Sequence, residues 1–268
     1  MAILGDGPIR KMTTKLEEEV RYSLPIGDQS IDMNPLLGQT IRILYSGEIR
    51  CIACGRRTKK SFSQGHCFVC LRKLASCDTC IVRPEECHYE QGTCREPQWG
   101  ETHCLIPHTV YLSNTGTLKV GITRGGNEPI RWVDQGATQA IAIRTVPNRL
   151  ASGQVEVAFK GHVSDRTNWR VMLSGVPEEI DLGAERDRLF DELQDVLGLL
   201  PGSEVKVPPM TIRYPVLQYP EKVRSLNLDK APIVQGVLQG IKGQYLLLDT
   251  GVINMRKYAG YVLEVSAD

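Results

Sequence analysis

Apolar and polar residues alternate with a period of two along much of the chain, which is the pattern of a β-strand buried on one face. The alternation is clear from Val20 to Leu24 and from Thr40 to Tyr45, with Asp28 as a turn-forming residue between them. Strands are predicted at residues 20–24, 40–45, 211–217, 233–238, 245–248 and 261–265. The last predicted strands are separated by glycines, which favours a small twisted sheet or barrel at the end of the chain.

The middle of the chain combines strands with helices. Apolar runs at 109–112 and 118–122 flank the sequence Ser-Asn-Thr-Gly, which predicts a β-hairpin, and a further apolar run covers 137–146. Residues 150–163 have apolar positions at helical spacing. A second apolar stripe runs from Ile180 to Leu200, after Pro177 and before Pro201-Gly202, which predicts a helix with a defined start and end.

These patterns predict an α+β protein of several modules, since 268 residues are many for one hydrophobic core. We expect an N-terminal β segment at 1–50, a zinc-ribbon-like cysteine-rich module with two zinc ions at 51–107, an α/β domain at 108–175, and a helix with a small β domain at 176–268. The two β segments at the ends of the chain are similar in character, so we expect them to pack together as one sheet system.

The composition is that of a soluble globular protein, with 41% hydrophobic and 24% charged residues. No apolar run approaches the length that spans a bilayer, so no membrane partner is expected. The first residues contain no long apolar stretch of the kind found in secretory signals, which predicts a cytoplasmic protein. The oligomeric state is not indicated by the sequence.

All nine cysteines lie between Cys51 and Cys104, which favours metal ligation over scattered disulfides in a reducing compartment. The pairs Cys51-x2-Cys54 and Cys67-x2-Cys70 have the spacing of two zinc knuckles, so we predict a structural zinc site with four thiolate ligands. An iron–sulfur cluster is the chemical alternative, because it also takes four cysteines.

A second zinc site is expected just after the first. The preferred ligands are Cys77, Cys80, Cys87 and Cys94, and Cys104 is the first substitute. The alternatives are a set of three cysteines with His103 and a catalytic zinc site that keeps one position open.

Charge is unevenly distributed although the net charge is only +1. Between Thr40 and Ser76 the only acidic residue is Glu48, and the lysines and arginines are Arg42, Arg50, Arg56, Arg57, Lys59, Lys60, Arg72 and Lys73. Such a basic run predicts a surface that binds phosphates, with Arg56, Arg57, Lys59, Lys60, Arg72 and Lys73 as the candidate contacts to RNA or DNA. The alternative interpretation is a solvated loop around the zinc ion.

A resemblance to a nuclease superfamily rests on the motifs His-Thr-Val-Tyr-Leu at 108–112 and Lys-Val-Gly-Ile-Thr at 119–123, followed by Arg131 and Glu156. From about 109 to 169 the chain resembles the GIY-YIG nucleases, which implies a GIY-YIG-like α/β domain. The resemblance implies that Tyr111 acts as a general base with Lys119 as its cationic neighbour. It also implies that Arg131 binds phosphate and that Glu156 holds Mg²⁺. The chain departs from the family pattern in lacking the first glycine and in having Lys119 where many members have tyrosine.

The whole chain also resembles a bacterial family of zinc-containing proteins of unknown function. This resemblance rests on the cysteine array, on 119–123, on Arg-Trp-Val-Asp-Gln-Gly-Ala at 131–137 and on Gly-Ile-Lys-Gly-Gln-Tyr at 240–245. We expect a zinc-containing nucleic-acid-binding protein on a GIY-YIG-like scaffold that has lost its nuclease activity. One alternative is an active metal-dependent endonuclease that hydrolyses RNA or DNA, and another is a zinc-stabilised adaptor for a protein partner.

Overall fold

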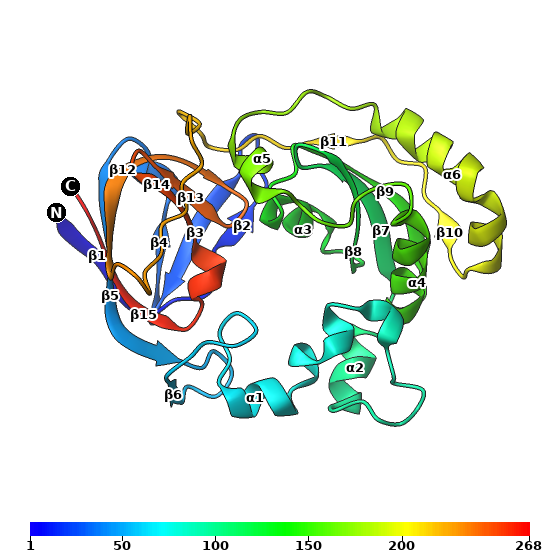
Figure 1. Ribbon diagram of the computed structural model, residues 1–268, viewed down its shortest axis with the longest axis horizontal. Helices are drawn as coiled ribbons and strands as arrows, with labels where there is room; N and C mark the ends of the chain where they lie inside the picture. Colours follow the sequence, from blue (N-terminus) through cyan, green and yellow to red (C-terminus); the bar gives the residue numbers. More distant parts are fainter. The chain divides into compact units, whose positions relative to one another are not determined.

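The computed structural model describes all 268 residues as a mixed α/β protein with three β-sheets and six α-helices. The chain forms two compact units, and each is described by itself (Figure 1). Unit 1 consists of Met1–Arg72, Leu173–Gly175 and Arg213–Asp268, and unit 2 consists of Lys73–Met172 and Val176–Ile212. These units cross the boundaries of the four consecutive segments expected from the sequence, because the first and last parts of the chain share unit 1.

Unit 1 is built almost entirely from strands. They are β1 (Ala2–Pro8), β2 (Thr13–Lys15), β3 (Arg21–Ile26), β4 (Gln29–Asp32), β5 (Thr40–Arg50), β6 (Arg57–Thr58), β12 (Ile233–Lys242), β13 (Tyr245–Leu248), β14 (Gly251–Asn254) and β15 (Tyr261–Ala267). Its short helices are η1 (Asn34–Leu36), η5 (Met255–Tyr258) and most of α1 (Phe68–Lys73).

The main sheet of unit 1 joins the two ends of the chain. Its strand order is β1-β15-β5-β12-β13-β14, and all of the described pairings are antiparallel. The terminal amine of Met1 lies 3.5 Å from the Asp268 carboxylate, and the two chain ends lie side by side in Figure 1. The terminal β segments therefore form one sheet system, as their similar sequence character indicated.

Unit 2 combines a sheet with the longer helices. Its strands are β7 (His108–Asn114), β8 (Leu118–Arg124), β9 (Gln139–Val146), β10 (Ser203–Glu204) and β11 (Met210–Thr211). Its helices are η2 (Ala75–Cys77), η3 (Thr79–Ile81), η4 (Pro84–Glu86), α2 (Pro97–His103), α3 (Glu128–Asp134), α4 (Arg149–Phe159), α6 (Leu182–Leu199) and most of α5 (Trp169–Leu173). None of the helices in the structure combines the length and the apolar character needed to cross a membrane.

The core of unit 2 lies between its sheet and helices α4 and α6, which run along one side of the sheet in Figure 1. Strand side chains alternate between the two faces, so Val110, Leu112 and Val120 enter this core whereas Tyr111 and Lys119 belong to the opposite face. The predicted hairpin and both predicted helices are present, although α6 begins at Leu182 because Asp181 caps its first turn by accepting a hydrogen bond from Ala184.

The predicted strand at 211–217 is wrong, because only Met210–Thr211 is a strand. The Ile212 amide still donates to the Thr138 carbonyl in unit 2, at 2.8 Å. Pro215 has no amide hydrogen to extend a ladder, and Val216 makes only an isolated bridge to Gly240 in unit 1.

Lys242 is the charged residue of the motif at 240–245, and it lies in the interior of unit 1. Its side chain is fully buried in unit 1, where Nζ donates to the Gly175 carbonyl at 3.2 Å and lies 5.6 Å and 5.3 Å from the ring centres of Tyr214 and Tyr219. No carboxylate pairs with it, and burial lowers the pKa of Lys242 to about 8. The buried lysine therefore has a structural role in the packing of unit 1.

The burial of Lys242 predicts a pH-dependent stability. The folded protein loses the Lys242 proton at about pH 8, whereas the unfolded chain keeps it to about pH 10.5. The free energy of unfolding of the wild type minus that of Lys242→Met should therefore rise by about 3 kcal/mol from the lower to the higher of these two pH values. Urea unfolding across this range measures the difference. The exposed Lys222→Met variant serves as a control and should show no such change, and a flat difference for Lys242→Met would contradict the prediction.

Candidate functional site

The first four predicted cysteines come together in unit 1. The Sγ atoms of Cys51, Cys54, Cys67 and Cys70 all lie within 4.8 Å of one another. Cys51 follows directly after β5, and Cys67 precedes the first turn of α1, whose Leu71 amide donates to its carbonyl at 2.9 Å. These four residues form a candidate metal site whose donors are compatible with zinc.

Local backbone geometry shapes this sulfur cluster. Gly55 has a φ of +70°, and its amide donates to the Cys51 carbonyl at 2.8 Å, which closes a tight turn after the first pair of cysteines. Burial alone would raise the pKa of Cys51, but backbone hydrogen bonds from Cys67, Cys54 and Ala53 outweigh it and lower this pKa to about 6. The turn therefore favours a thiolate, which is the form that binds metal.

Burial and the neighbouring sulfur atoms have the opposite effect at Cys70, whose pKa they raise. Negative charges crowded among four sulfur atoms repel one another, and a divalent cation would relieve that repulsion. The electrostatics of the cluster thus agree with its donor geometry.

The basic residues around this cluster are exposed. The predicted phosphate contacts in unit 1 are Arg56, Arg57, Lys59, Lys60 and Arg72, and Lys73 belongs to unit 2. None of the six forms an ion pair with a carboxylate, and the Lys60 ammonium lies 5.4 Å from the ring centre of Phe62. Their charge is therefore available to an anionic ligand.

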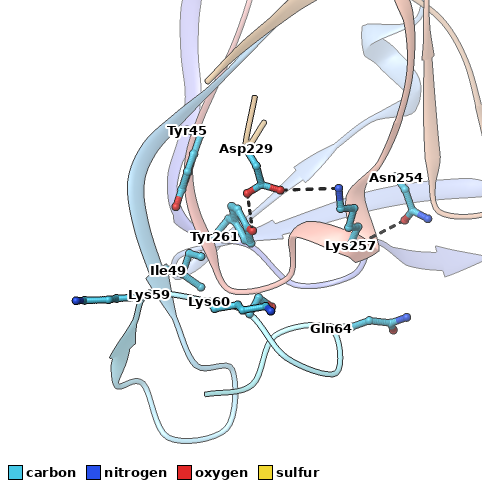
Figure 2. Close-up of a pocket in the computed structure, with 10 residues that line it drawn as sticks. Tyr45, Ile49, Lys59, Lys60, Gln64, Asp229, Asn254, Lys257 and Tyr261 are labelled. Atoms are coloured by element: carbon cyan, nitrogen blue, oxygen red, sulfur yellow. Dashed lines mark hydrogen bonds and ion pairs between the residues drawn. The ribbon is translucent and has the colours of Figure 1, made fainter. Parts of the chain in front are cut away.

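A pocket of about 640 Å³ lies next to these cations in unit 1 (Figure 2). It is lined by Tyr45, Ile49, Lys59, Lys60, Ser61, Gln64, Asp229, Asn254, Lys257 and Tyr261. The rings of Tyr45 and Tyr261 lie 4.9 Å apart. The Tyr261 hydroxyl donates to Asp229 at 2.8 Å, and Lys257 lies 3.8 Å from the same carboxylate. The pocket thus joins an aromatic wall to a polar and cationic rim.

The four residues of the predicted catalytic constellation lie together in unit 2. Tyr111 is on β7, Lys119 on β8, Arg131 on α3 and Glu156 on α4. Arg131 and Glu156 are electrostatic neighbours of both Tyr111 and Lys119. Four elements that are separate in the sequence therefore direct charged or polar groups to one region.

Gly121 allows the closest contact in this region. It is the cross-strand partner of Tyr111, and a Cβ atom at its position would lie 2.6 Å from the Tyr111 ring and hydroxyl. Any larger residue would displace the tyrosine. The second tripeptide of the motif therefore has a packing role.

Tyr111 is fully buried, and its hydroxyl donates to Gln135 Oε1 at 2.6 Å. Trp132 packs against its ring edge-on, with ring centres 6.0 Å apart. Burial raises the pKa of Tyr111 even though Arg131 acts in the opposite direction. A general base at neutral pH needs a lowered pKa, so the raised pKa of Tyr111 is unfavourable for that role. The contact between Gln135 and Tyr111 joins residues from α3's C-terminal end and β7, so it depends on the fold and not on local sequence.

Lys119 and Glu156 are also removed from water. Burial, with the nearby Arg131, lowers the pKa of Lys119 to about 8, and its Nζ lies 3.4 Å from Thr167 Oγ1. Burial raises the pKa of Glu156. Lys160 lies 3.9 Å from Glu156 and 3.2 Å from Asp165, so two carboxylates of unit 2 share this lysine.

Most cysteines of the second group gather around one cavity. Cys80, Cys87, Cys94 and Cys104 line one small cavity of unit 2, and Cys77 is not among its lining residues. Cys77 is the last residue of η2, whereas Cys80 lies in the next short helix, η3. The two cysteines are close in the sequence, but only Cys80 lines the cavity.

The first cysteine cluster gives a direct prediction about folding. Cys51→Ser or Cys70→Ser should lose the bound zinc ion and unfold the segment from 51 to 70, because structural zinc supplies about 10–16 kcal/mol of binding free energy to comparable folds. Zinc analysis and limited proteolysis measure both effects. Ser61→Ala is a control in the same loop, since the Ser61 hydroxyl is buried without a hydrogen-bond partner. A cysteine variant with unchanged zinc content and protease resistance would contradict the prediction.

The chain matches the model of one protein family from residue 38 to residue 263. This range begins after β4 and contains all nine cysteines. It also contains Tyr111, Lys119, Arg131 and Glu156. No curated protein and no solved structure shows a significant match. Because the matched range covers most of the sequence, the chain belongs to the family described as Protein of unknown function (DUF2797).

Proposed function

We propose that this protein binds single-stranded nucleic acid, RNA or DNA, through the pocket of unit 1 and the loop between Cys54 and Cys67, which zinc at the first cysteine cluster holds in place. The observation that carries the proposal is that exposed cations without carboxylate partners border an aromatic pocket. Proteins that bind single strands combine a cationic surface for the phosphates with aromatic rings for the bases.

The chemistry of the pocket divides between its two sides. Lys59 and Lys60 supply positive charge from the loop, where phosphates would lie. Tyr45 supplies an aromatic face, and Asn254 and Gln64 supply amides that can donate to or accept from the edges of a base. Lys257 is already paired with Asp229, so the loop lysines are the cations that remain for a ligand.

The volume of the pocket is consistent with this class of ligand. At about 640 Å³ it lies within the usual range for small-molecule sites and is large enough for a nucleotide. Aromatic stacking is worth about 1–3 kcal/mol per base in such proteins and tolerates any sequence. We therefore expect binding with little sequence preference and a strong dependence on salt.

Charge reversal of the two pocket lysines tests the proposal. Lys59→Glu combined with Lys60→Glu should weaken the binding of a labelled oligonucleotide and should lower the slope of log K against log salt by about 1.4, because each phosphate contact on a single strand contributes about 0.7. Fluorescence anisotropy at several salt concentrations measures both quantities. Tyr45→Ala should weaken binding by about 5- to 150-fold with an unchanged slope.

The matched control reverses two other exposed charges of unit 1. Lys222→Glu with Arg224→Glu changes the net charge by the same amount, but neither residue lines the pocket. Equal weakening by both pairs would show that net charge, and not the pocket, governs binding. Absence of binding at low salt, together with a copurified protein that survives nuclease treatment, would favour the adaptor function instead.

Metal-dependent phosphodiester cleavage in unit 2 is the second candidate function. Its support is the convergence of Tyr111, Lys119, Arg131 and Glu156 from a hairpin, the helix that follows it and a later helix, which is the order that the GIY-YIG resemblance implies. Arg131 and Lys119 would bind phosphate oxygens. Glu156, with Asp165 nearby, would hold Mg²⁺, which commonly takes one or two carboxylates and stabilises charge on the phosphate.

Three substitutions test this activity. If the protein cuts RNA or branched DNA in Mg²⁺ or Mn²⁺, Tyr111→Phe, Arg131→Ala and Glu156→Gln should each abolish the cutting, and their effects should be non-additive because the groups act on one transition state. Gel assays measure cleavage, and anisotropy measures binding, which should remain because it belongs to the pocket of unit 1.

Glu192→Gln is the control, since Glu192 is an exposed carboxylate of the same unit that pairs with Arg188. An inert wild type, or a Glu156→Gln variant as active as the wild type, would exclude nuclease activity. The burial of Tyr111 and its raised pKa agree better with a scaffold that has lost this activity than with an active base.

A further inference from the structure

The cavity that Cys80, Cys87, Cys94 and Cys104 share has the size and surroundings of a site for a single ion. Its volume is about 20 Å³, slightly more than the roughly 10–15 Å³ that one water molecule requires. The apolar or aromatic residues around it are Ala75, Ile81, Tyr89, Trp99 and Gly100. Four cysteine side chains that line one small space beside apolar groups offer the donor types of a closed metal site.

The four thiols are also electrostatic neighbours. Cys80 interacts with Cys87 and Cys104, and Cys104 interacts with Cys87 and Cys94, so the set is connected around the cavity. All four are unpaired as disulfides.

A half-buried cation beside the cavity points to an anionic centre. Arg149 donates to the carbonyls of Ile81 at 2.6 Å and of Cys80 at 3.4 Å, yet no carboxylate pairs with it. Its largest electrostatic interactions are with the sulfur atoms of Cys104 and Cys80, ahead of those with Arg131 and Glu156. A charge taken out of water requires compensation, and a zinc ion with four thiolates carries a net charge of −2. The guanidinium and such a centre would neutralise each other in part.

Two nearby alternatives are less suitable as ligand sets. Asp78, Cys80 and His88 bring donor atoms within 4.8 Å of one another, and Asp78 and His88 also line the cavity. However, the Asp78 carboxylate already accepts from Arg95 at 2.8 Å and lies 3.3 Å from His88 Nε2. His103, which the sequence offered as a fourth ligand, does not line the cavity, and its ring stacks on Trp99.

We infer that Cys80, Cys87, Cys94 and Cys104 bind a second zinc ion in a closed site with four thiolate ligands. The site takes Cys104 in place of the predicted Cys77. A single ion suits a cavity of about 20 Å³, whereas an iron–sulfur cluster would need more space.

This ion would hold helix α4 against the cysteine-rich segment. The Arg149 amide at the start of α4 donates to the Cys104 carbonyl at 2.8 Å. One turn further, Gly153 packs so closely that a Cβ atom would lie 2.4 Å from the Glu85 amide. Since Glu156 is on the same helix, the second metal site would position that carboxylate.

Native mass spectrometry of the full chain, purified with zinc, tests the inference. The wild type should carry two zinc ions per chain, one at each cysteine cluster. Cys87→Ser and Cys104→Ser should each carry one ion, whereas Cys77→Ser and His88→Ala should keep two. Retention of the ion at the first cluster shows that each variant remains folded in unit 1. One ion in the wild type, loss of an ion in Cys77→Ser, or two ions in Cys104→Ser would each overturn the inference.

A measurement on the wild type tests the same ligand set without variants, which could fold poorly. X-ray absorption at the zinc edge should show an average of four sulfur ligands at about 2.3 Å for the two ions. A nitrogen or oxygen ligand would assign His88, His103 or Asp78 to the second site and would overturn the proposed set.

Discussion

Strand β5 is paired along both edges, and unit 1 depends on this double ladder. On one side β15 pairs with it from Ile41 to Ile49, and on the other side β12 pairs with it from Thr40 to Leu44. The strand therefore holds the last strand of the chain to the middle of the sheet, and β15 in turn holds β1. Because Cys51 follows directly after β5, the same ladder fixes the start of the first cysteine cluster.

The pocket of unit 1 is a consequence of this arrangement. Tyr45 and Ile49 come from β5, Tyr261 begins β15, and the loop lysines follow the first cysteine pair. A sheet built from both ends of the chain places the loop of the metal site beside residues of the C-terminal strands. Arg256 donates to Gln64 at 2.6 Å, which joins the C-terminal segment directly to that loop. The proposed ligand site at the pocket and the candidate metal site at the cluster are thus joined through the same segment.

In unit 2 the sheet separates two environments. One face packs against α4 and α6 in an apolar core. The other face carries Tyr111 and Lys119. Burial shifts the pKa of each of these two side chains more than the neighbouring charges do. Helix α4 belongs to both environments and also contacts the cysteine-rich segment through Gly153. The chemistry available around Glu156 therefore depends on how firmly that segment is held.

The sequence alone determined the features that depend on local spacing. Periodicity, turn residues and two knuckle spacings predicted the hairpin at 108–124, helices α4 and α6, five of the ten strands of unit 1 (β3, β5, β12, β13 and β15) and the four cysteines of the first cluster. Each of these features is decided within a few residues. Only the tertiary structure decided that Cys104 and not Cys77 lines the second cavity, that Tyr45 and Tyr261 share a pocket with Lys60, and that Tyr111 is buried against Gln135. These features arise from contacts between residues far apart in the chain. A cavity or a shifted pKa is a property of everything that surrounds a group, and the surroundings exist only after the strands and helices have packed.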